Sequence, residues 1–82
     1  MTARPVKRSL TLQGHRTSVS LEEAFWRAFR EIAAAKGMAI NALAAEIDAG
    51  RLPETGLGSA IRVYVLRHFQ AHAAARDKRP DV

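Results

Sequence analysis

The sequence contains no cysteine, few aromatic residues and no long apolar run, and each absence excludes a class of protein. Without cysteine, the 82-residue chain can form neither a disulfide nor a cysteine-based metal site. No apolar run approaches the ~20 residues that a membrane-spanning helix needs. The basic residues Arg4, Lys7 and Arg8 are not followed by the apolar segment of a secretory signal. We therefore expect a cytoplasmic protein that binds no membrane.

The sequence also lacks the residue patterns of catalytic and cofactor sites. It shows no nucleophile paired with a base, no paired carboxylates and no glycine-rich phosphate loop. His68 and His72 have the spacing of two metal ligands on one helix face, but no third ligand lies near them in the sequence. We therefore expect that the protein is not an enzyme and that it binds neither a metal ion nor a cofactor.

The chain does contain enough hydrophobic residues, 48% of the total, to form a folded domain. We expect one domain over residues 8–75, between a flexible arm at 1–7 and a flexible tail at 76–82. A chain of this size buries only about 60–65% of its unfolded surface and is marginally stable alone. Self-association is the expected reinforcement.

Positive charge is in surplus and unevenly placed. The net charge is +5, and arginine supplies ten of the thirteen basic residues. Residues 1–20 hold four basic residues and no acid. Arginine suits bidentate contacts to phosphate and guanine, so this distribution favours a nucleic-acid partner.

Two segments on either side of Gly14-His15 alternate with period two and predict a β-hairpin over residues 8–21. A type II′ turn at Gly14-His15 would pair Gln13 with Arg16. The polar face then holds Ser9, Thr11, Gln13, Arg16, Ser18 and Ser20. The apolar face holds Leu10, Leu12, Thr17, Val19 and Leu21.

Three helical patterns follow the hairpin. The first runs from Leu21 to about Lys36, and Gly37 is the expected left-handed stop. Its apolar stripe comprises Leu21, Phe25, Ala28, Phe29 and Ile32, with Trp26 on the flank. The second helix is expected over 40–49, and the third begins with Ser59 as its cap and ends near residue 75.

Four features follow one another in the sequence: the segment Arg16-Thr17-Ser18-Val19-Ser20-Leu21-Glu22-Glu23, the stripe through Phe25 and Phe29, Gly37, and Asn41-Ala42-Leu43. Together they resemble the ribbon–helix–helix family of Arc, MetJ and CopG type repressors. The wider string also resembles a short prokaryotic subfamily of these proteins. That string comprises Lys7-Arg8-Ser9, Gly14-His15-Arg16-Thr17-Ser18, Phe25-Trp26 and Ser59-Ala60-Ile61-Arg62-Val63. The fold class implied is mostly helical with a short β-ribbon, extended by an amino-terminal strand and a third helix.

The resemblance implies an intertwined homodimer that places a β-ribbon in the major groove of double-stranded DNA and regulates transcription. The implied dimer core is Val19, Leu21, Phe25, Trp26, Phe29, Leu43 and Ile47. The implied base-contacting residues are Arg16, Ser18 and Ser20. The implied phosphate-binding residues are Lys7, Arg8, His15, Ile40 and Asn41. Ala39 replaces the hydroxyl residue usual in the family, so that backbone N–H groups and Asn41 would bind the phosphate.

Three alternatives stay open at this point. Ser20 could cap the first helix in a Ser-x-x-Glu capping box, which would occupy its hydroxyl. A different register would make Lys7, Ser9, Thr11 and Gln13 the base-contacting set. The protein could instead be a dimeric interaction module, antitoxin-like or an adaptor, that uses the third helix to bind a protein partner and does not contact DNA.

Overall fold

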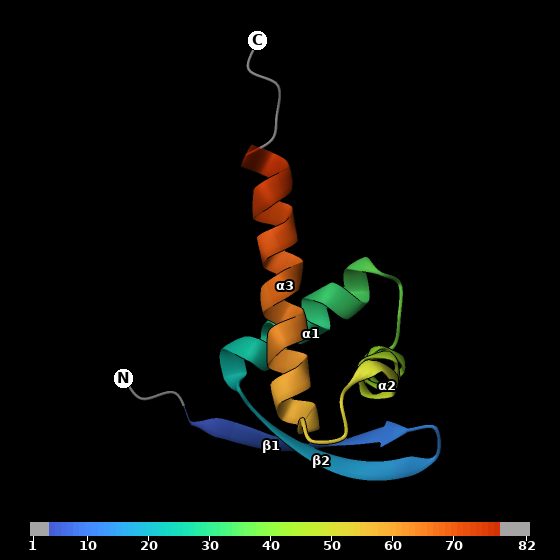
Figure 1. The fold of residues 1–82 in the computed structure, drawn as a ribbon. Coiled ribbons are helices and arrows are strands. Elements are labelled where there is room, and N and C mark those ends of the chain that lie inside the picture. Colours follow the sequence, from blue (N-terminus) through green and yellow to red (C-terminus); the bar gives the residue numbers. More distant parts are fainter. Residues whose placement is uncertain (1–3, 78–82) are drawn as a thin grey trace.

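The structure, a computed structural model, describes residues 4–77 and contains a β-hairpin followed by three helices (Figure 1). The elements are β1 (Pro5–Leu12), β2 (His15–Glu22), α1 (Glu23–Ala35), α2 (Ile40–Gly50) and α3 (Leu57–Asp77). Residues 5–7 of the expected arm belong to β1, and residues 76–77 of the expected tail belong to α3. The rest of both segments, apart from Arg4, lies outside the described residues.

The hairpin turn differs from the expected one. Leu12 pairs with His15, so the two-residue turn is Gln13-Gly14 and not Gly14-His15. Gln13 has a φ of 52° and Gly14 a φ of 84°, which together define a type I′ turn. Both turn types match the right-handed twist of the strands, but type I′ needs a positive φ at both central residues, which Gln13 and Gly14 supply.

The shift in register leaves the two faces of the hairpin unchanged. Every pair moves by two residues, and side chains alternate with a period of two. Leu10, Val19 and Leu21 are buried under the helices, as expected. The predicted sorting of the strand residues, apart from turn residue Gln13, is therefore confirmed.

Helix α1 begins two residues later than expected, at Glu23, and Glu22 precedes it as the N-cap without a side-chain cap. Ser20 lies in β2, so the capping-box alternative is wrong. Gly37 has a φ of 67° and follows the end of α1, as expected. Trp26 is not on the flank but at the centre of the buried face, where its Nε1 donates to the Val6 carbonyl at 2.8 Å.

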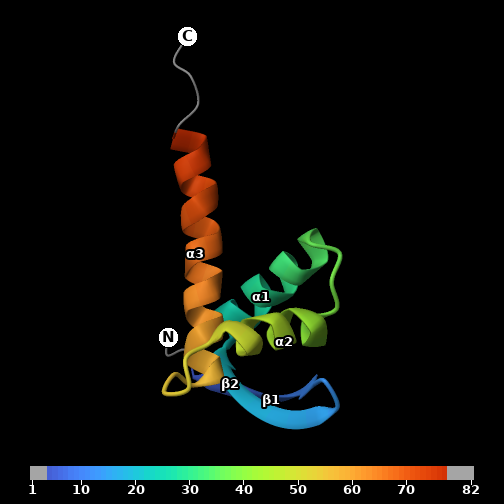
Figure 2. The same ribbon diagram turned by 45° about the vertical axis from the view of Figure 1, so that its right-hand side comes forward.

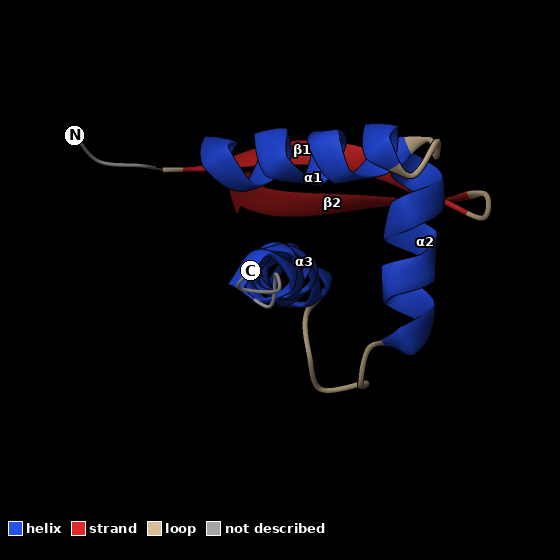
Figure 3. Ribbon diagram, turned by 90° about the horizontal axis from the view of Figure 1, so that it is seen from above, coloured by secondary structure: helices blue, strands red, loops and turns tan. Residues whose placement is uncertain are grey.

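All three helices lie on one side of the hairpin (Figures 1 and 2). Seen from above, α1 runs along β1, α2 crosses near the turn, and α3 stands beside β2 (Figure 3). The second half of α3 extends away from the other elements. The opposite face of the hairpin is covered by no described element.

Helix α3 begins at Leu57, which places Ser59 inside its first turn and not at the cap. Gly58 lies close to β2, since a Cβ at this position would be 3.4 Å from the Ser20 carbonyl oxygen. A residue without a side chain therefore lets the start of α3 approach the strand.

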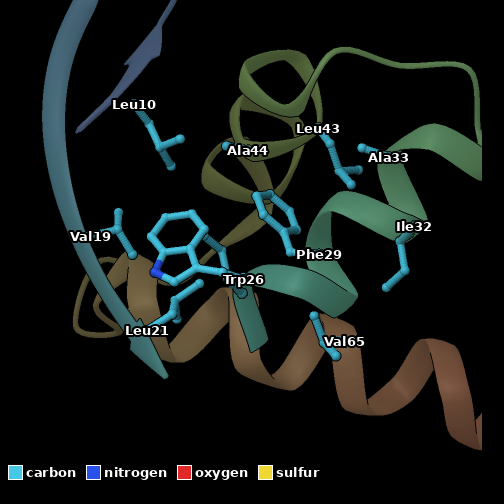
Figure 4. Packing of buried hydrophobic residues seen from close by; sticks show 11 residues of the cluster. Leu10, Val19, Leu21, Trp26, Phe29, Ile32, Ala33, Leu43, Ala44 and Val65 are labelled. Atoms are coloured by element: carbon cyan, nitrogen blue, oxygen red, sulfur yellow. The ribbon is translucent and has the colours of Figure 1, made fainter. Parts of the chain in front are cut away.

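A single chain buries the hydrophobic core (Figure 4). The core contains Leu10, Val19, Leu21, Trp26, Phe29, Ile32, Ala33, Leu43, Ala44, Ile61 and Val65. Ile61 and Val65 come from α3, which closes the core against α1. Of the residues expected at a dimer core, Val19, Leu21, Trp26, Phe29 and Leu43 are already buried within the chain, and Phe25 and Ile47 are partly buried. The homodimer, with Phe25 and Ile47 at its core, stays a prediction.

Candidate nucleic-acid interface

The uncovered face of the hairpin carries six exposed side chains from two strands. They are Lys7, Ser9 and Thr11 of β1 and Arg16, Ser18 and Ser20 of β2. The pairs are Lys7 with Ser20, Ser9 with Ser18, and Thr11 with Arg16. Both sets considered in the sequence analysis thus lie together on one surface, except Gln13, which is in the turn. We call this surface the outer face.

The outer face is positively charged. Among residues 4–77, neither Lys7 nor Arg16 forms an ion pair. The nearest acid along the strand, Glu22, accepts from Arg62 Nε at 2.9 Å. This hydrogen bond holds the pKa of Glu22 below its usual range. Glu22 is therefore ionised and neutralised by Arg62, and it leaves the charge of Lys7 and Arg16 available to an anion.

Arg8 lies on the helix side of the hairpin, away from Lys7. Its guanidinium donates to Glu23 Oε1 at 3.0 Å and lies 5.6 Å from the centre of the Trp26 ring. Partial desolvation raises the pKa of Glu23, but the charges and hydrogen bonds of Arg8 and Arg30 lower it more. Arg8 thus connects β1 to α1, and the structure does not bring it to the outer face with Lys7.

Arg62 has a structural role that its sequence pattern did not predict. Besides Glu22, it binds the Ser20 carbonyl through Nη2 at 3.2 Å, and its guanidinium lies 5.8 Å from the Phe25 ring centre. These contacts fix α3 beside the end of β2. One sign of this role was present in the sequence, which is that Arg62 lies on a helix that also carries buried residues.

The amino end of α2 lies beside β1 near the hairpin turn. Asn41 Oδ1 accepts from the Thr11 backbone N–H at 3.2 Å. Ala39 is the N-cap and provides no side-chain hydrogen bond. Because Leu43 N–H is the first to reach a helical acceptor, the Ala39 carbonyl, the N–H groups of Ile40, Asn41 and Ala42 are directed out of the helix end. A helix end with free N–H groups attracts phosphate. The hydrogen bond of Asn41 to the Thr11 backbone connects this end of α2 to β1.

His15 does not lie on the outer face. It follows the turn on the helix side and lines a hollow of about 350 Å³ between the hairpin and α2, together with Asp48 and Arg51. Arg51 Nε donates to Asp48 Oδ1 at 2.6 Å. His15 therefore lies on the opposite side of the hairpin from the six outer side chains, and its expected phosphate contact stays a prediction.

His68 and His72, which have the spacing of two metal ligands, both lie on α3. The His68 and His72 rings lie 4.5 Å apart between their centres. Within residues 4–77, no group of three histidine, aspartate or glutamate residues is placed to hold a metal ion. In the same part of the chain, no helix is long and apolar enough to cross a membrane.

A two-stranded ribbon followed by two helices on one side defines a ribbon–helix–helix architecture, and here a third helix is added. The chain matches the ribbon-helix-helix domain family over residues 5–69, and it belongs to that family. No curated protein and no solved structure matches the chain. Members of the family are generally DNA-binding transcriptional regulators or antitoxins, and the fold is a non-enzymatic one.

Proposed function

We propose that this protein binds double-stranded DNA sequence-specifically through the outer face of its hairpin and regulates transcription. The observation that carries the proposal is that all six outer side chains are exposed, that each is basic or carries a hydroxyl, and that no described element covers them. A two-stranded ribbon fits the major groove, which is about 12 Å wide. Arginine can bind the O6 and N7 atoms of guanine, and hydroxyl groups can bind several bases.

The end of α2 supports the same orientation. With the outer face in the groove, backbone N–H groups of α2 lie close to the hairpin, where they can bind a phosphate at the edge of the groove. Backbone donors at a helix end fix the position of a protein on DNA without contacting bases. Arg16 would then supply base contacts, and Ile40 and Asn41 would supply phosphate contacts.

The salt dependence of binding tests this proposal. Each phosphate neutralised by lysine or arginine contributes roughly −0.9 to the slope of log K against log salt. We expect the protein to bind as a homodimer that neutralises about 4–8 phosphates, with a slope of roughly −4 to −7. Fluorescence anisotropy with a labelled duplex between 50 and 200 mM salt measures it. A slope near zero, or no duplex binding, would refute the proposal.

A second candidate function, binding of a protein partner, rests on a groove beside α3. The groove has a volume of about 620 Å³ between the end of α2 and α3. Its apolar lining includes Ile47, Leu52, Val63 and Tyr64, of which Leu52 is 62% and Val63 45% exposed. An apolar segment of another protein is the chemistry that this groove fits.

Displayed peptides test the second candidate. Peptides selected on the wild-type protein should be apolar, and their affinity should fall at least about tenfold on Val63→Asp, because a charge would be buried in the groove. The matched control is Leu66→Asp, since Leu66 lies on the same helix with 54% exposure but does not line the groove. Equal loss in both variants, or selection of no peptide, would exclude a binding role for the groove.

A further inference from the structure

One face of α3 carries exposed apolar side chains on the half of the helix that extends away from the other elements (Figure 1). Leu66 is 54% and Phe69 45% exposed, and neither lines the groove between α2 and α3. Among the described residues, the hairpin and α1 have no exposed apolar side chain of this size. An isolated helical segment shorter than about 12–15 residues is marginally stable in water, so a partner would stabilise this half of α3.

The spacing of residues along this face is that of a coiled coil. Its members follow one another at alternating intervals of three and four residues, and they are Ser59, Arg62, Leu66, Phe69 and Ala73. These intervals keep side chains on one line along a helix, and two such lines pack together when helices supercoil. We call these five residues the α3 stripe.

The α3 stripe offers little charge to a partner. Its single ionisable residue, Arg62, already donates to the Glu22 carboxylate at 2.9 Å. The stripe is flanked on the extended half by Gln70 and His72, and neither is lysine, arginine or an acid. DNA and anionic membranes bind to clusters of free cations, which this face does not provide. A second apolar stripe of the same kind fits it better.

The stripe adjoins a residue that the resemblance places in the dimer core. The Arg62 guanidinium lies 5.8 Å from the centre of the Phe25 ring. Arg62 and Leu66 are four residues apart and therefore neighbours on one face of α3. Phe25 is only partly buried within the chain, and members of the family typically bind DNA as dimers. A second copy at the predicted dimer core is therefore also beside the stripe.

The direction of α3 selects a parallel arrangement of the two copies. Seen from above, the hairpin lies in the plane of the view and α3 is seen nearly end-on (Figure 3). The helix thus stands almost perpendicular to the hairpin, on the side opposite the outer face. Antiparallel packing of two α3 helices would direct the two outer faces in opposite directions. A twofold axis parallel to α3 directs both outer faces to the same side, as binding of a dimer to one duplex requires.

We propose that the α3 stripe packs in parallel against the same stripe of a second copy and forms a two-helix dimer contact that points away from DNA. The inference rests on the proposed function and adds to it a surface that joins two chains on one duplex. Leu66 and Phe69 pack against their counterparts, and the small side chain of Ala73 lets the helices stay close toward their ends. This contact extends the dimer core implied by the resemblance and does not replace it.

Single cysteines test the pairing, because the chain has none of its own. In a parallel pair each stripe residue lies opposite its own counterpart. Leu66→Cys and Ala73→Cys should therefore each form a disulfide-linked dimer under mild oxidation. The matched control is Ala71→Cys, which is exposed on the far side of α3 and should stay unlinked. Linkage at only one stripe position, at neither, or equally at Ala71→Cys would overturn the inference.

The strength of the dimer provides a second measurement. Leu66→Asp should raise the dissociation constant of the dimer at least about tenfold, because it places a carboxylate in an apolar contact. Ala71→Asp adds the same charge on the far side of the helix and should leave the constant unchanged. Sedimentation equilibrium of the full chain measures both, and near-ultraviolet circular dichroism of the buried Trp26 reports whether the core is intact.

Duplex binding separates the inference from the proposed function. If wild type binds duplex DNA as a dimer and Leu66→Asp dimerises equally well, the inference is overturned and DNA binding stands. If wild type is cross-linked at both stripe positions but binds no duplex, the proposed function is refuted and the contact between α3 helices stands.

Discussion

Replacing Trp26 with alanine is expected to destabilise the folded chain by about 3–5 kcal/mol, the range for removing a large aromatic side chain from a core. Trp26 is 1% exposed, packs on Phe29 with 6.4 Å between ring centres, and donates a hydrogen bond to the Val6 carbonyl. The substitution therefore removes packing between α1 and the hairpin together with a bond that joins them. A small domain has only about 5–15 kcal/mol of stability. Urea unfolding monitored by circular dichroism measures the change.

The matched control is Phe25→Ala, one position earlier on the same helix. Phe25 is only partly buried and lies beside the Arg62 guanidinium, so its loss should cost clearly less than that of Trp26. An equal or larger loss for Phe25, dependent on protein concentration, would contradict burial by a single chain. It would show that a second copy buries Phe25, as the predicted intertwined dimer requires.

Replacing Arg16 with alanine is expected to reduce the preference for the best DNA element by about 5- to 140-fold. This range corresponds to the loss of one bidentate contact worth about 1–3 kcal/mol. Arg16 is exposed on the outer face opposite Thr11, and among the described residues no acid neutralises it. Competition between the selected element and a scrambled duplex, at one salt concentration, measures the preference.

Arg8→Ala is the control for Arg16→Ala because it removes the same charge from the same hairpin. Arg8 is bound to Glu23 on the helix side, so its loss should leave the preference between duplexes unchanged and lower thermal stability. This expectation replaces the phosphate contact that the sequence analysis gave to Arg8. Equal effects of the two variants on the preference would show that only net charge matters, and the base-contacting role of Arg16 would be wrong.

The sequence predicted the faces of the hairpin more securely than its turn. Gly14 was taken as the first residue of the turn because glycine is usual there, but Gln13 also adopts a positive φ and moves the turn by one position. Register depends on such local details. The faces do not, because an error of two residues returns every side chain to the same side.

Arginine roles were the least predictable part of the candidate site. Strand alternation placed Arg16 and not Arg8 on the polar face, but nothing in the sequence indicated the partners of Arg8 and Arg62. Arg8 binds an acid of α1, and Arg62 binds an acid at the end of β2 from α3, forty residues away. Long charged side chains can extend along apolar surface to distant partners, so their direction depends on which elements are adjacent.

By itself, the sequence determined the alternation of the strands, the existence of three helices, the polar outer face and the ribbon–helix–helix family. The first three follow from local periodicity, which neighbouring residues specify, whereas the family follows from the resemblance of the motif residues. Only the tertiary structure decided that α3 closes the core of a single chain, that Arg8 binds Glu23 of α1, and that Arg62 binds Glu22 at the end of β2. These outcomes depend on contacts between residues distant in sequence, and no local pattern encodes which of the possible partners they meet.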